Sequence, residues 1–491
     1  MDGQVFSTAK TGFVVTSPSA FERKIVPIAV DNSDHAAIAL YATESKIYPR
    51  GVTGFFSNIR WITVWLTQII FYGFPWLEWG QRQAVLFDLG ARRFFVFGLV
   101  LYPQDLVYLT AMLVIAALTL FLFTAVAGRL WCGYACPQTV YTEIFLWIEK
   151  KVCGDRSARM RLDAGPWTLN RYTRKVTKHV LWGVFSLWTG FTFVGYFTSI
   201  RELTLDVWQL NPTTWETFWI LFYALATYGN AGYLREQICK HMCPYARFQS
   251  AMFDKDTLVV AYDKERGEPR GARSRKSDPL SLNLGACVDC NLCFQVCPTG
   301  IDIRHGLQYE CIGCGACADV CNTVMDKMGY ARGLVKYSTE NAVEKKWTKS
   351  QIWHRVFRPR VLVYTSILAG ILFAVIFNLV TRTPFKVDVV PDRGVVRVVE
   401  AGNIENIYRM QVMNAMESTQ KFSVSVSGLP GIQITSENKL AVESTQSRWL
   451  AIRVQLPAET SAPGSYAIYF QVSALDSPGQ VIEKSVFRVP N

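Results

Sequence analysis

A charge-free run from Leu106 to Ala127 most constrains what this chain can fold into. A helix crosses the hydrocarbon core of a bilayer with about 20 apolar residues, so this run is long enough for one span. Hydrophobic residues make up 50% of the 491 residues, which is too apolar for an ordinary soluble enzyme. We therefore predict a polytopic membrane protein with five spans, at 61–77, 106–127, 180–200, 217–234 and 361–381.

Two segments near the first spans are less regular. The run 61–77 is short and contains Gln68 and Pro75, although tilting or flanking Trp side chains could accommodate it. The stretch 94–104 is too short for a span, and we interpret it as an interfacial or re-entrant piece, with a surface loop as the alternative.

The distribution of Lys and Arg predicts the orientation. Residues 129–178 hold ten of them, whereas 201–214 hold only Arg201. Because basic loops stay in the cytoplasm, 129–178 is predicted to be cytoplasmic. The N-terminal segment 1–58 and the segment 235–359 then lie on the same side, and 382–491 lies outside. The first fifty residues lack a basic start followed by an apolar core, so insertion is expected to rely on the first span.

Cysteine usage agrees with this orientation. All 13 cysteines lie between Cys132 and Cys321, in segments predicted to be cytoplasmic or at the membrane edge. The segments predicted to be exported have none. Thiols stay reduced in the cytoplasm, so this distribution favours metal ligands over disulfides.

The strongest motif is an internal repeat of cysteines. "CVDCNLCFQVCP" at 287–298 and "CIGCGACADVCN" at 311–322 share the spacing C-x2-C-x2-C-x3-C, offset by 24 residues. In two-cluster ferredoxins three cysteines of such a run hold one [4Fe-4S] cluster and the fourth holds the other. This predicts a 2[4Fe-4S] ferredoxin domain, with one cluster on Cys287, Cys290, Cys293 and Cys321 and the other on Cys311, Cys314, Cys317 and Cys297.

An alternative for this repeat is a pair of four-cysteine zinc sites. Such sites usually separate their C-x-x-C halves by a longer loop, so the spacing favours iron–sulfur clusters. One departure is Asn322, which stands where the first run has Pro298. It changes the turn there and leaves the ligands in place.

Two further cysteine pairs follow apolar runs. "WCGYACPQTV" at 131–140 and "CKHMCPY" at 239–245 both read C-x-x-x-C-P. The i, i+4 spacing predicts that each pair shares one helical face, and the proline is expected to end that helix. Spans two and four run in the same direction, so both pairs should meet at the cytoplasmic membrane edge. We predict a catalytic or metal-binding group there, formed by Cys132, Cys136, Cys239 and Cys243, hereafter the four-cysteine site.

The ligand of the four-cysteine site stays open. Four soft sulfurs suit Cu(I), a further iron–sulfur centre or a redox dithiol. The alternative without a function is that these cysteines are small apolar packing residues. His179 and His241 could also ligate haem or copper, although ordinary interface roles are the simpler interpretation.

The remaining cytoplasmic features indicate few partners. The basic run 266–276 is interpreted as a solvated linker near anionic lipid, and no nucleic-acid partner is expected. No Gly-rich turn of a flavin or nicotinamide site is present, so the electron donor must be external and cytoplasmic.

The tail 382–491 alternates polar and apolar residues. "FSVSVSGL", "WLAIRVQL" and "YAIYFQVSAL" are separated by turn sequences such as "SAPGS". About seven short strands predict an immunoglobulin-like β-sandwich.

Several of these sequences together resemble one known family. "KIYPRGVTGFF" near residue 50, "GRLWCGYACPQTV", "CKHMCPYARFQSAM", the ferredoxin repeat and the tail are similar to the CcoG family of cytochrome c oxidase accessory proteins, also called FixG or RdxA. The resemblance implies a bacterial inner-membrane protein with five spans, two cytoplasmic clusters and a periplasmic immunoglobulin-like domain. It also implies reduction of Cu(II) to Cu(I), with copper ions and assembly factors of cbb3-type oxidase as partners.

Two other functions stay open. The C-x-x-x-C-P pairs also occur in the membrane subunits of quinol dehydrogenases, which suggests a quinol-linked relay to a periplasmic reductase. A non-catalytic assembly factor for the oxidase is the second alternative.

Overall fold

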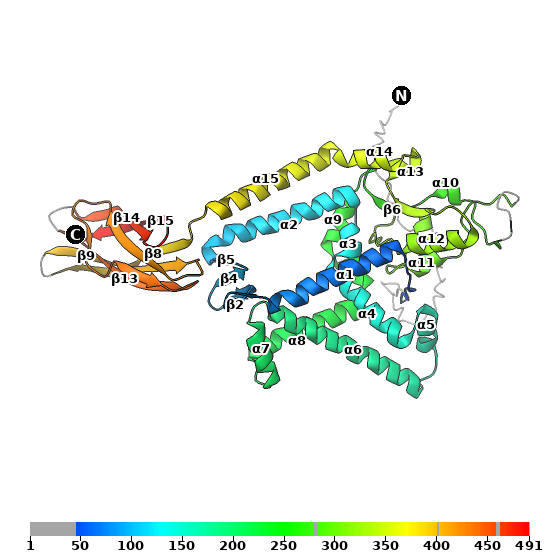
Figure 1. Ribbon diagram of the computed structural model, residues 1–491, viewed down its shortest axis with the longest axis horizontal. Coiled ribbons are helices and arrows are strands. Elements are labelled where there is room, and N and C mark those ends of the chain that lie inside the picture. Colours follow the sequence, from blue (N-terminus) through cyan, green and yellow to red (C-terminus); the bar gives the residue numbers. More distant parts are fainter. Residues whose placement is uncertain (1–45, 276, 278–281, 400–401, 458–461, 491) are drawn as a thin grey trace, which may run out of the picture. The chain divides into compact units, whose positions relative to one another are not determined.

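The computed structural model describes residues 46–275, 277, 282–399, 402–457 and 462–490 (Figure 1). The chain forms two compact units, which are described separately here. Unit 1 comprises Met1–Phe74, Met112–Gly195 and Ile200–Gly370, and unit 2 comprises Pro75–Ala111, Tyr196–Ser199 and Ile371–Asn491.

Unit 1 contains a group of packed helices. They are α1 (Phe55–Gly73), α3 (Leu130–Tyr134), α4 (Pro137–Cys153), α5 (Arg156–Ala164), α6 (Leu169–Val194), α7 (Ile200–Trp208), α8 (Thr214–Gly229) and α9 (Pro244–Met252). Between α8 and α9 the chain forms two π-helical turns, η3 (Asn230–Leu234) and η4 (Ile238–Met242). Such turns are frequent at functional sites.

Close packing joins the helices of unit 1. Gly190 of α6 lets α8 approach, because a Cβ there would lie 2.4 Å from the carbonyl oxygen of Ile220. Next to this crossing Trp182 of α6 stacks on Phe145 of α4, with ring centroids 5.0 Å apart. The crossing fixes α4, α6 and α8 as one group.

The second part of unit 1 carries the cysteine repeat. Its elements are β6 (Val259–Tyr262), α10 (Lys264–Gly267), α11 (Leu292–Gln295), η5 (Ile303–His305), α12 (Ala316–Met328), β7 (Val335–Ser338), α13 (Glu340–Glu344), α14 (Lys349–His354) and η6 (Arg355–Phe357). Strands β6 and β7 pair antiparallel, and their buried residues Val260 and Val335, with Leu334 just before β7, pack with Ala318 and Met325 of α12.

A buried carboxylate ties this part to α1. Asp319 of α12 accepts hydrogen bonds from the backbone N–H of Phe56 (3.2 Å) and of Ser57 (2.7 Å) at the start of α1. The N-terminal N–H groups of a helix have no intrahelical partner and carry partial positive charge, so a carboxylate there stabilises the helix. Asp319 thereby fixes α12 against α1.

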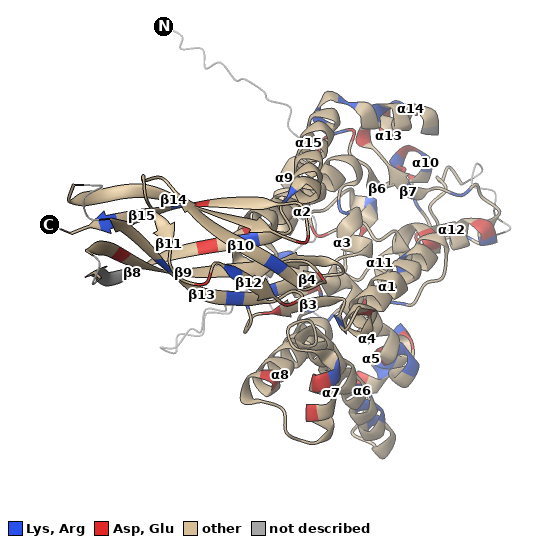
Figure 2. Cartoon of the chain, turned by 60° about the vertical axis from the view of Figure 1, so that its left-hand side comes forward, with Lys and Arg blue, Asp and Glu red and all other residues tan. Residues whose placement is uncertain are grey.

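Two helices are apolar and long enough to cross a membrane. Within the described residues, the segments Pro103–Ala127 and Pro359–Thr381 meet this test; they contain α2 (Leu106–Ala127) and α15 (Pro359–Thr381). Figure 2 shows both helices almost free of charged residues. The other three predicted spans lie in α1, α6 and α8 with η3, which are helical but shorter or more polar, so the five-span arrangement stays a prediction.

The exposed faces of these three helices are nevertheless apolar. Large hydrophobic side chains are exposed on each, and contiguous apolar surface of this kind marks contact with a membrane or a partner. Examples are Ile62, Trp65 and Ile69 on α1, Val184, Leu187 and Trp188 on α6, and Phe218, Phe222 and Leu225 on α8.

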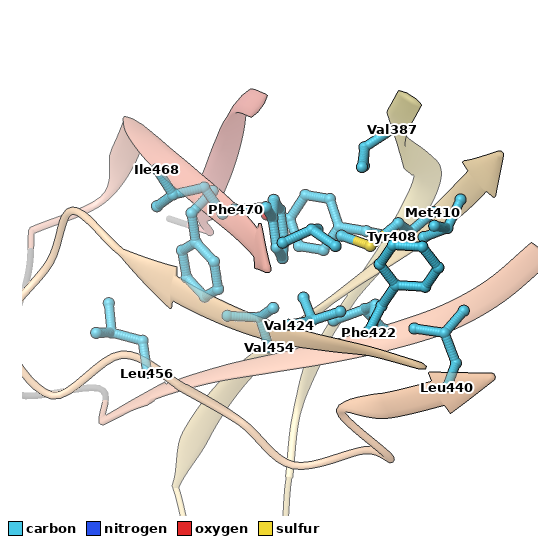
Figure 3. Close-up of a cluster of buried hydrophobic side chains, with 14 of the residues drawn as sticks. Val387, Tyr408, Met410, Phe422, Val424, Leu440, Val454, Leu456, Ile468 and Phe470 are labelled. Carbon is cyan, nitrogen blue, oxygen red and sulfur yellow. The ribbon is translucent and has the colours of Figure 1, made fainter. Parts of the chain in front are cut away.

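Unit 2 contains the predicted β-sandwich. Its strands are β8 (Phe385–Val398), β9 (Asn403–Asn414), β10 (Gln420–Ser427), β11 (Gln433–Ile434), β12 (Lys439–Val442), β13 (Ser447–Pro457), β14 (Gly464–Ala474) and β15 (Gln480–Val489). They form two four-stranded sheets, in the orders β12-β10-β14-β15 and β11-β13-β9-β8. Alternate residues of both sheets, among them Tyr408, Phe422 and Phe470, fill the core between them (Figure 3).

The segment before α2 folds onto this sandwich. Strands β3 (Val85–Asp88), β4 (Arg93–Val96) and β5 (Leu99–Leu101) form a small sheet after the short pair β1 (Glu78–Trp79) and β2 (Arg82–Gln83). Phe95 and Val100 pack on Met413, and the Tyr102 hydroxyl donates to the carbonyl oxygen of Asn414 at 2.8 Å. Residues 94–104 therefore form β4, β5 and the turn before α2, and they pack on the sandwich; an interfacial position of this segment stays a prediction.

Candidate iron–sulfur and four-cysteine sites

Four cysteines surround a first cavity in the repeat region. Its walls include Tyr262, Leu292, Met325 and Leu334. The thiols come from the loop before α11, from α11 itself and from α12: Cys287, Cys290, Cys293 and Cys321. Cys321 belongs to the second cysteine run, so this cavity, the candidate first cluster site, is lined by cysteines of both runs, in the grouping that the ferredoxin spacing predicts for the ligands.

A second cavity lies beside the first. Its walls include Ile301, Ile312 and Ala316, and Cys293 borders both cavities. The other cysteines that line it are Cys297, Cys311, Cys314 and Cys317. This second cluster site therefore takes Cys297 from the first run.

The backbone between the cysteines also suits a cluster. In the first run Asp289 (φ 49°) and Asn291 (φ 56°) are left-handed, and 24 residues later Gly313 (φ 65°) and Gly315 (φ 72°) are left-handed too. Asp, Asn and Gly are the residues that tolerate this conformation best. Alternating left-handed residues turn successive N–H groups to one side, which is how iron–sulfur and phosphate sites are lined.

The two cluster sites differ in exposure. Cys290 of the first site is exposed, whereas Cys314 of the second is buried. Burial raises the pKa of Cys311 to about 12. An isolated thiol in such a place would stay protonated, and a thiolate requires positive charge beside it. Soft thiolates, apolar walls and inward N–H groups fit [4Fe-4S] clusters, with the ligands named above.

The prediction that the two cysteines of each C-x-x-x-C-P pair lie on one face of a continuous helix was wrong. Cys132 lies in α3, but Cys136 is extended (φ −62°, ψ 128°) and precedes α4, whose first residue is Pro137. Cys243 has the same role (φ −76°, ψ 110°) before Pro244 of α9. Proline is favoured at the first position of a helix, where its missing N–H costs nothing, so it starts a helix here instead of ending one.

The four thiols are nevertheless neighbours. Burial, together with the nearby Cys136 and Cys243, raises the pKa of Cys239 to about 11. The same holds for Cys132, whose pKa is raised to about 12 by burial and then by Cys136. The structure thus brings the two pairs together, from α3 and from η4.

Across the described ranges, no three His, Cys, Asp or Glu side chains are placed to hold a single metal ion. This includes the cysteines around both cavities, since the ligands of a four-iron cube stand farther apart than those of one ion.

The four-cysteine site is in direct contact with the second cluster site. Cys132 packs on the apolar cluster that contains Ile312 and Cys314. The Tyr134 hydroxyl donates to the carbonyl oxygen of Cys314 (3.3 Å), and the Tyr337 hydroxyl donates to that of Gly313 (2.5 Å). Helix α3 is thereby held on the loop that carries the second site.

Other residues considered from the sequence have structural roles. Arg273 of the basic run donates to the carbonyl oxygens of Cys287 (3.3 Å) and Gly285 (2.6 Å), so it supports the first cluster loop and is not part of a free linker. His179 hydrogen-bonds to the Tyr228 hydroxyl through Nδ1 at 2.8 Å, as an interface residue does.

Three curated proteins are similar to this chain over most of its length. FixG, a nitrogen fixation protein of Rhizobium meliloti, is 37% identical over 85% of this chain and 88% of its own. RdxB of Cereibacter sphaeroides is 39% identical over 88% of this chain and 93% of its own, and RdxA of the same organism is 38% identical over 82% and 87%. The chain belongs to the FixG/RdxA family.

Family models of single domains cover the same regions. A 4Fe-4S dicluster domain matches residues 234–340, and the IG-like fold at the C-terminal of FixG matches 375–490. A separate 4Fe-4S binding domain matches 109–152, a segment that contains Cys132 and Cys136. This member of the FixG/RdxA family is therefore an iron–sulfur electron-transfer protein with a C-terminal immunoglobulin-like domain.

Three residues at these sites were missed by the sequence analysis. Arg129 and Gly133 flank Cys132 inside the quoted motif "GRLWCGYACPQTV", so their position was the available signal. Asp319 lies in the second cysteine run between Cys317 and Cys321. A negative charge beside a cluster opposes its reduction, so a carboxylate between cluster ligands was the available signal. It indicated that Asp319 has a role other than cluster binding.

Proposed function

We propose that this FixG/RdxA protein reduces Cu(II) to Cu(I) at its four-cysteine site, with electrons that arrive through the two cluster sites. The observation that carries the proposal is the contact of Cys132 and α3 with the loop of Cys314. Electron transfer between centres needs short distances, and this contact joins the four-cysteine site to the second cluster site.

The exposure of the cysteines supports a direction of transfer. Cys290 is exposed at the first site, where an external donor can approach, and no cysteine of the second site, which lies next to the four-cysteine site, is exposed to this degree. A bound [4Fe-4S] cluster accepts and releases one electron. Each electron delivered reduces one Cu(II), and the donor is a soluble one-electron carrier protein that is oxidised by one electron in return.

The four sulfurs suit this substrate. Cys132 donates a hydrogen bond through its Sγ to Oε1 of Gln249 at 3.3 Å, which orients the thiol. Thiolate ligands prefer Cu(I) to harder ions, so sulfur coordination favours the reduced product. The product would serve assembly of cbb3-type oxidase, with assembly factors as recipients.

The two units support a membrane topology for this reaction. The sheet β3–β4–β5 and the sandwich form one unit, and α2 and α15 join that unit to the cysteine-rich one. With both helices crossing the inner membrane, the cysteine-rich unit faces the cytoplasm and the sandwich the periplasm, as the basic loop 129–178 indicates.

A second candidate for the four-cysteine site is a third iron–sulfur centre. It is favoured by the 4Fe-4S binding domain matched at 109–152, which contains Cys132 and Cys136. The site would then pass electrons onward, for example to or from a quinone.

Iron content separates the two candidates. Protein purified anaerobically should hold about eight irons if only the two cluster sites are filled, and about twelve if the four-cysteine site holds a third cluster. For copper reduction, Cys239→Ser should retain the eight irons and lose Cu(II) reduction, with Cys153→Ser as the control cysteine. A Cys239→Ser protein that reduces Cu(II) at the wild-type rate would refute the proposal.

A further inference from the structure

Arg129 lies at the crossing point of three segments. Its side chain donates hydrogen bonds to the carbonyl oxygens of Tyr309, just before Cys311, and of Ala246 in α9. Its main-chain carbonyl is 3.4 Å from where a Cβ on Gly313 would lie. Arg129 thus joins the second cluster loop, the Cys243 segment and α3, and only 6% of its surface is exposed.

The other strongly buried cations of unit 1 have carboxylate partners. Arg60 pairs with Glu143 at 3.0 Å, and Glu149 pairs with Arg159 (3.1 Å), Arg235 (3.0 Å) and Lys178 (3.8 Å). Among the described side chains, no carboxylate lies within ion-pair distance of Arg129. Burying an unpaired charge is costly, so a buried guanidinium requires another source of negative charge.

Thiol groups occupy the positions where a counter-charge is needed. Cys132 lies three residues after Arg129 in α3, Cys311 lies between Tyr309 and Gly313, which both contact Arg129, and Cys243 lies three residues before Ala246, which accepts a hydrogen bond from Arg129. Cys311 belongs to the second cluster site, and Cys132 and Cys243 belong to the four-cysteine site. Metal–thiolate groups keep negative charge on sulfur, and such groups at both sites would neutralise Arg129 from two directions.

We propose that Arg129 is a positioning residue shared by the second cluster site and the four-cysteine site. The charge of Arg129 raises the reduction potential at the second cluster site, and its two hydrogen bonds hold the two sites together. The inference rests on the proposed function in one respect only: it takes the four-cysteine site as the place that receives electrons from the second cluster site. A positive charge beside a cluster favours the added electron, so electrons coming from the exposed first site collect next to the four-cysteine site.

Arg304 provides a matched control at the first site. It borders the first cavity, and its guanidinium pairs with Asp302 (2.6 Å) and Asp289 (2.5 Å). Arg304 therefore lies beside the first cluster site as Arg129 lies beside the second, but its charge is paired with two carboxylates.

The test is a redox titration of the full-length protein, followed by the electron paramagnetic resonance of its two reduced clusters. Arg129→Gln should make one of the two clusters about tenfold harder to reduce at fixed potential, a shift of about 59 mV to lower potential. Arg304→Gln should lower the other cluster's potential. Arg129→Lys keeps the charge, so its potentials should stay close to wild type, and its iron content should be retained.

Three results would overturn the proposal: no shift in Arg129→Gln, a shift of the same cluster in Arg129→Gln and Arg304→Gln, or loss of iron in Arg129→Lys. Loss of iron in Arg129→Gln alone supports the need for positive charge at this position. The titration involves no copper. A wild-type protein that fails to reduce Cu(II) would refute the proposed function. The shift in reduction potential would still test the role of Arg129 by itself.

Discussion

Gly133 of α3 lies directly on Cys314 of the second cluster site. A Cβ on Gly133 would lie 2.9 Å from the Cα of Cys314 and 2.8 Å from the carbonyl oxygen of Ile312. Both distances are shorter than ordinary van der Waals contact and involve backbone atoms, which cannot rotate away. The missing side chain therefore permits the contact between the four-cysteine site and the second cluster site.

Gly133→Ala should separate these two sites. The added methyl group must push α3 away from the loop of Cys314, so we expect electron transfer to the four-cysteine site to slow at least tenfold while both clusters stay reducible by dithionite. Stopped-flow absorbance of cluster reoxidation measures the rate. Gly183→Ala in α6 is the control, since a Cβ there meets no atom within 4 Å. Equal rates in the two variants would show that the contact does not carry electrons.

The exchange of cysteines between the runs gives a second prediction. Cys321→Ser should damage the first cluster, because Cys321 borders the first cavity, and Cys297→Ser should damage the second. Iron content and electron paramagnetic resonance will distinguish them through the loss of one cluster's signal in each variant. The opposite result, in which Cys321→Ser loses the second cluster and Cys297→Ser loses the first, would contradict the exchange of cysteines between the two runs.

The Glu149 ion cluster gives a third prediction, on stability. Burial opposes ionisation of Glu149, but Arg235, Arg159 and Lys178 together outweigh it and hold its pKa below the ordinary range. Glu149→Gln leaves three buried cations without their carboxylate and should cost about 3–5 kcal/mol. Thermal unfolding in detergent measures this. Asp326→Asn is the control, because the ion pair of Asp326 with Arg332 is largely exposed and its loss should leave the melting temperature unchanged.

The sign of the pH dependence follows from the lowered pKa. The stability that Glu149 contributes is present above the carboxyl pKa of the unfolded chain, about 4.3, and is lost as the pH falls through the lower folded value. The wild-type melting temperature should therefore fall steeply with acidification below about pH 4. The Glu149→Gln variant should lack that part of the fall. Parallel pH profiles for the two proteins would contradict the ionised, paired state of Glu149.

Local patterns in the sequence predict much of this fold. The alternation of residues in 403–489 predicts the sandwich, and the 24-residue repeat predicts which cysteines share a site, because both depend on neighbouring residues. The break between Cys132 and Cys136 was missed, since i, i+4 spacing assumes a continuous helix and Pro137 favours a new one.

Long-range contacts explain the other differences. Sheet β3–β4–β5 is completed by packing of Phe95 and Val100 on Met413, which is more than three hundred residues away. The role of Arg129 depends on Tyr309 and Ala246, and nothing near it in the sequence reports either neighbour. Spacing identifies ligands, but it cannot identify the charges that act on them.

The membrane topology is a fourth prediction. Leu89 is exposed in the loop between β3 and β4, within the unit of the sandwich, and Lys345 follows α13 in the cysteine-rich unit. In intact spheroplasts a membrane-impermeant maleimide should label Leu89→Cys and leave Lys345→Cys and the native cysteines unlabelled. Labelling of Lys345→Cys in sealed spheroplasts would reverse the orientation and place electron entry outside the cytoplasm.

The central claim is that reduced clusters pass their electrons to copper, and a single-turnover titration with Cu(II) tests it most directly. Full-length protein is reduced with dithionite, freed of excess reductant, and mixed anaerobically with Cu(II) and a Cu(I)-specific chelator. We expect one Cu(I) for each electron held, with recovery of cluster absorbance at the same rate. Clusters that stay reduced with Cu(II) but reoxidise with a soluble quinone would contradict the claim and favour the quinol-linked relay.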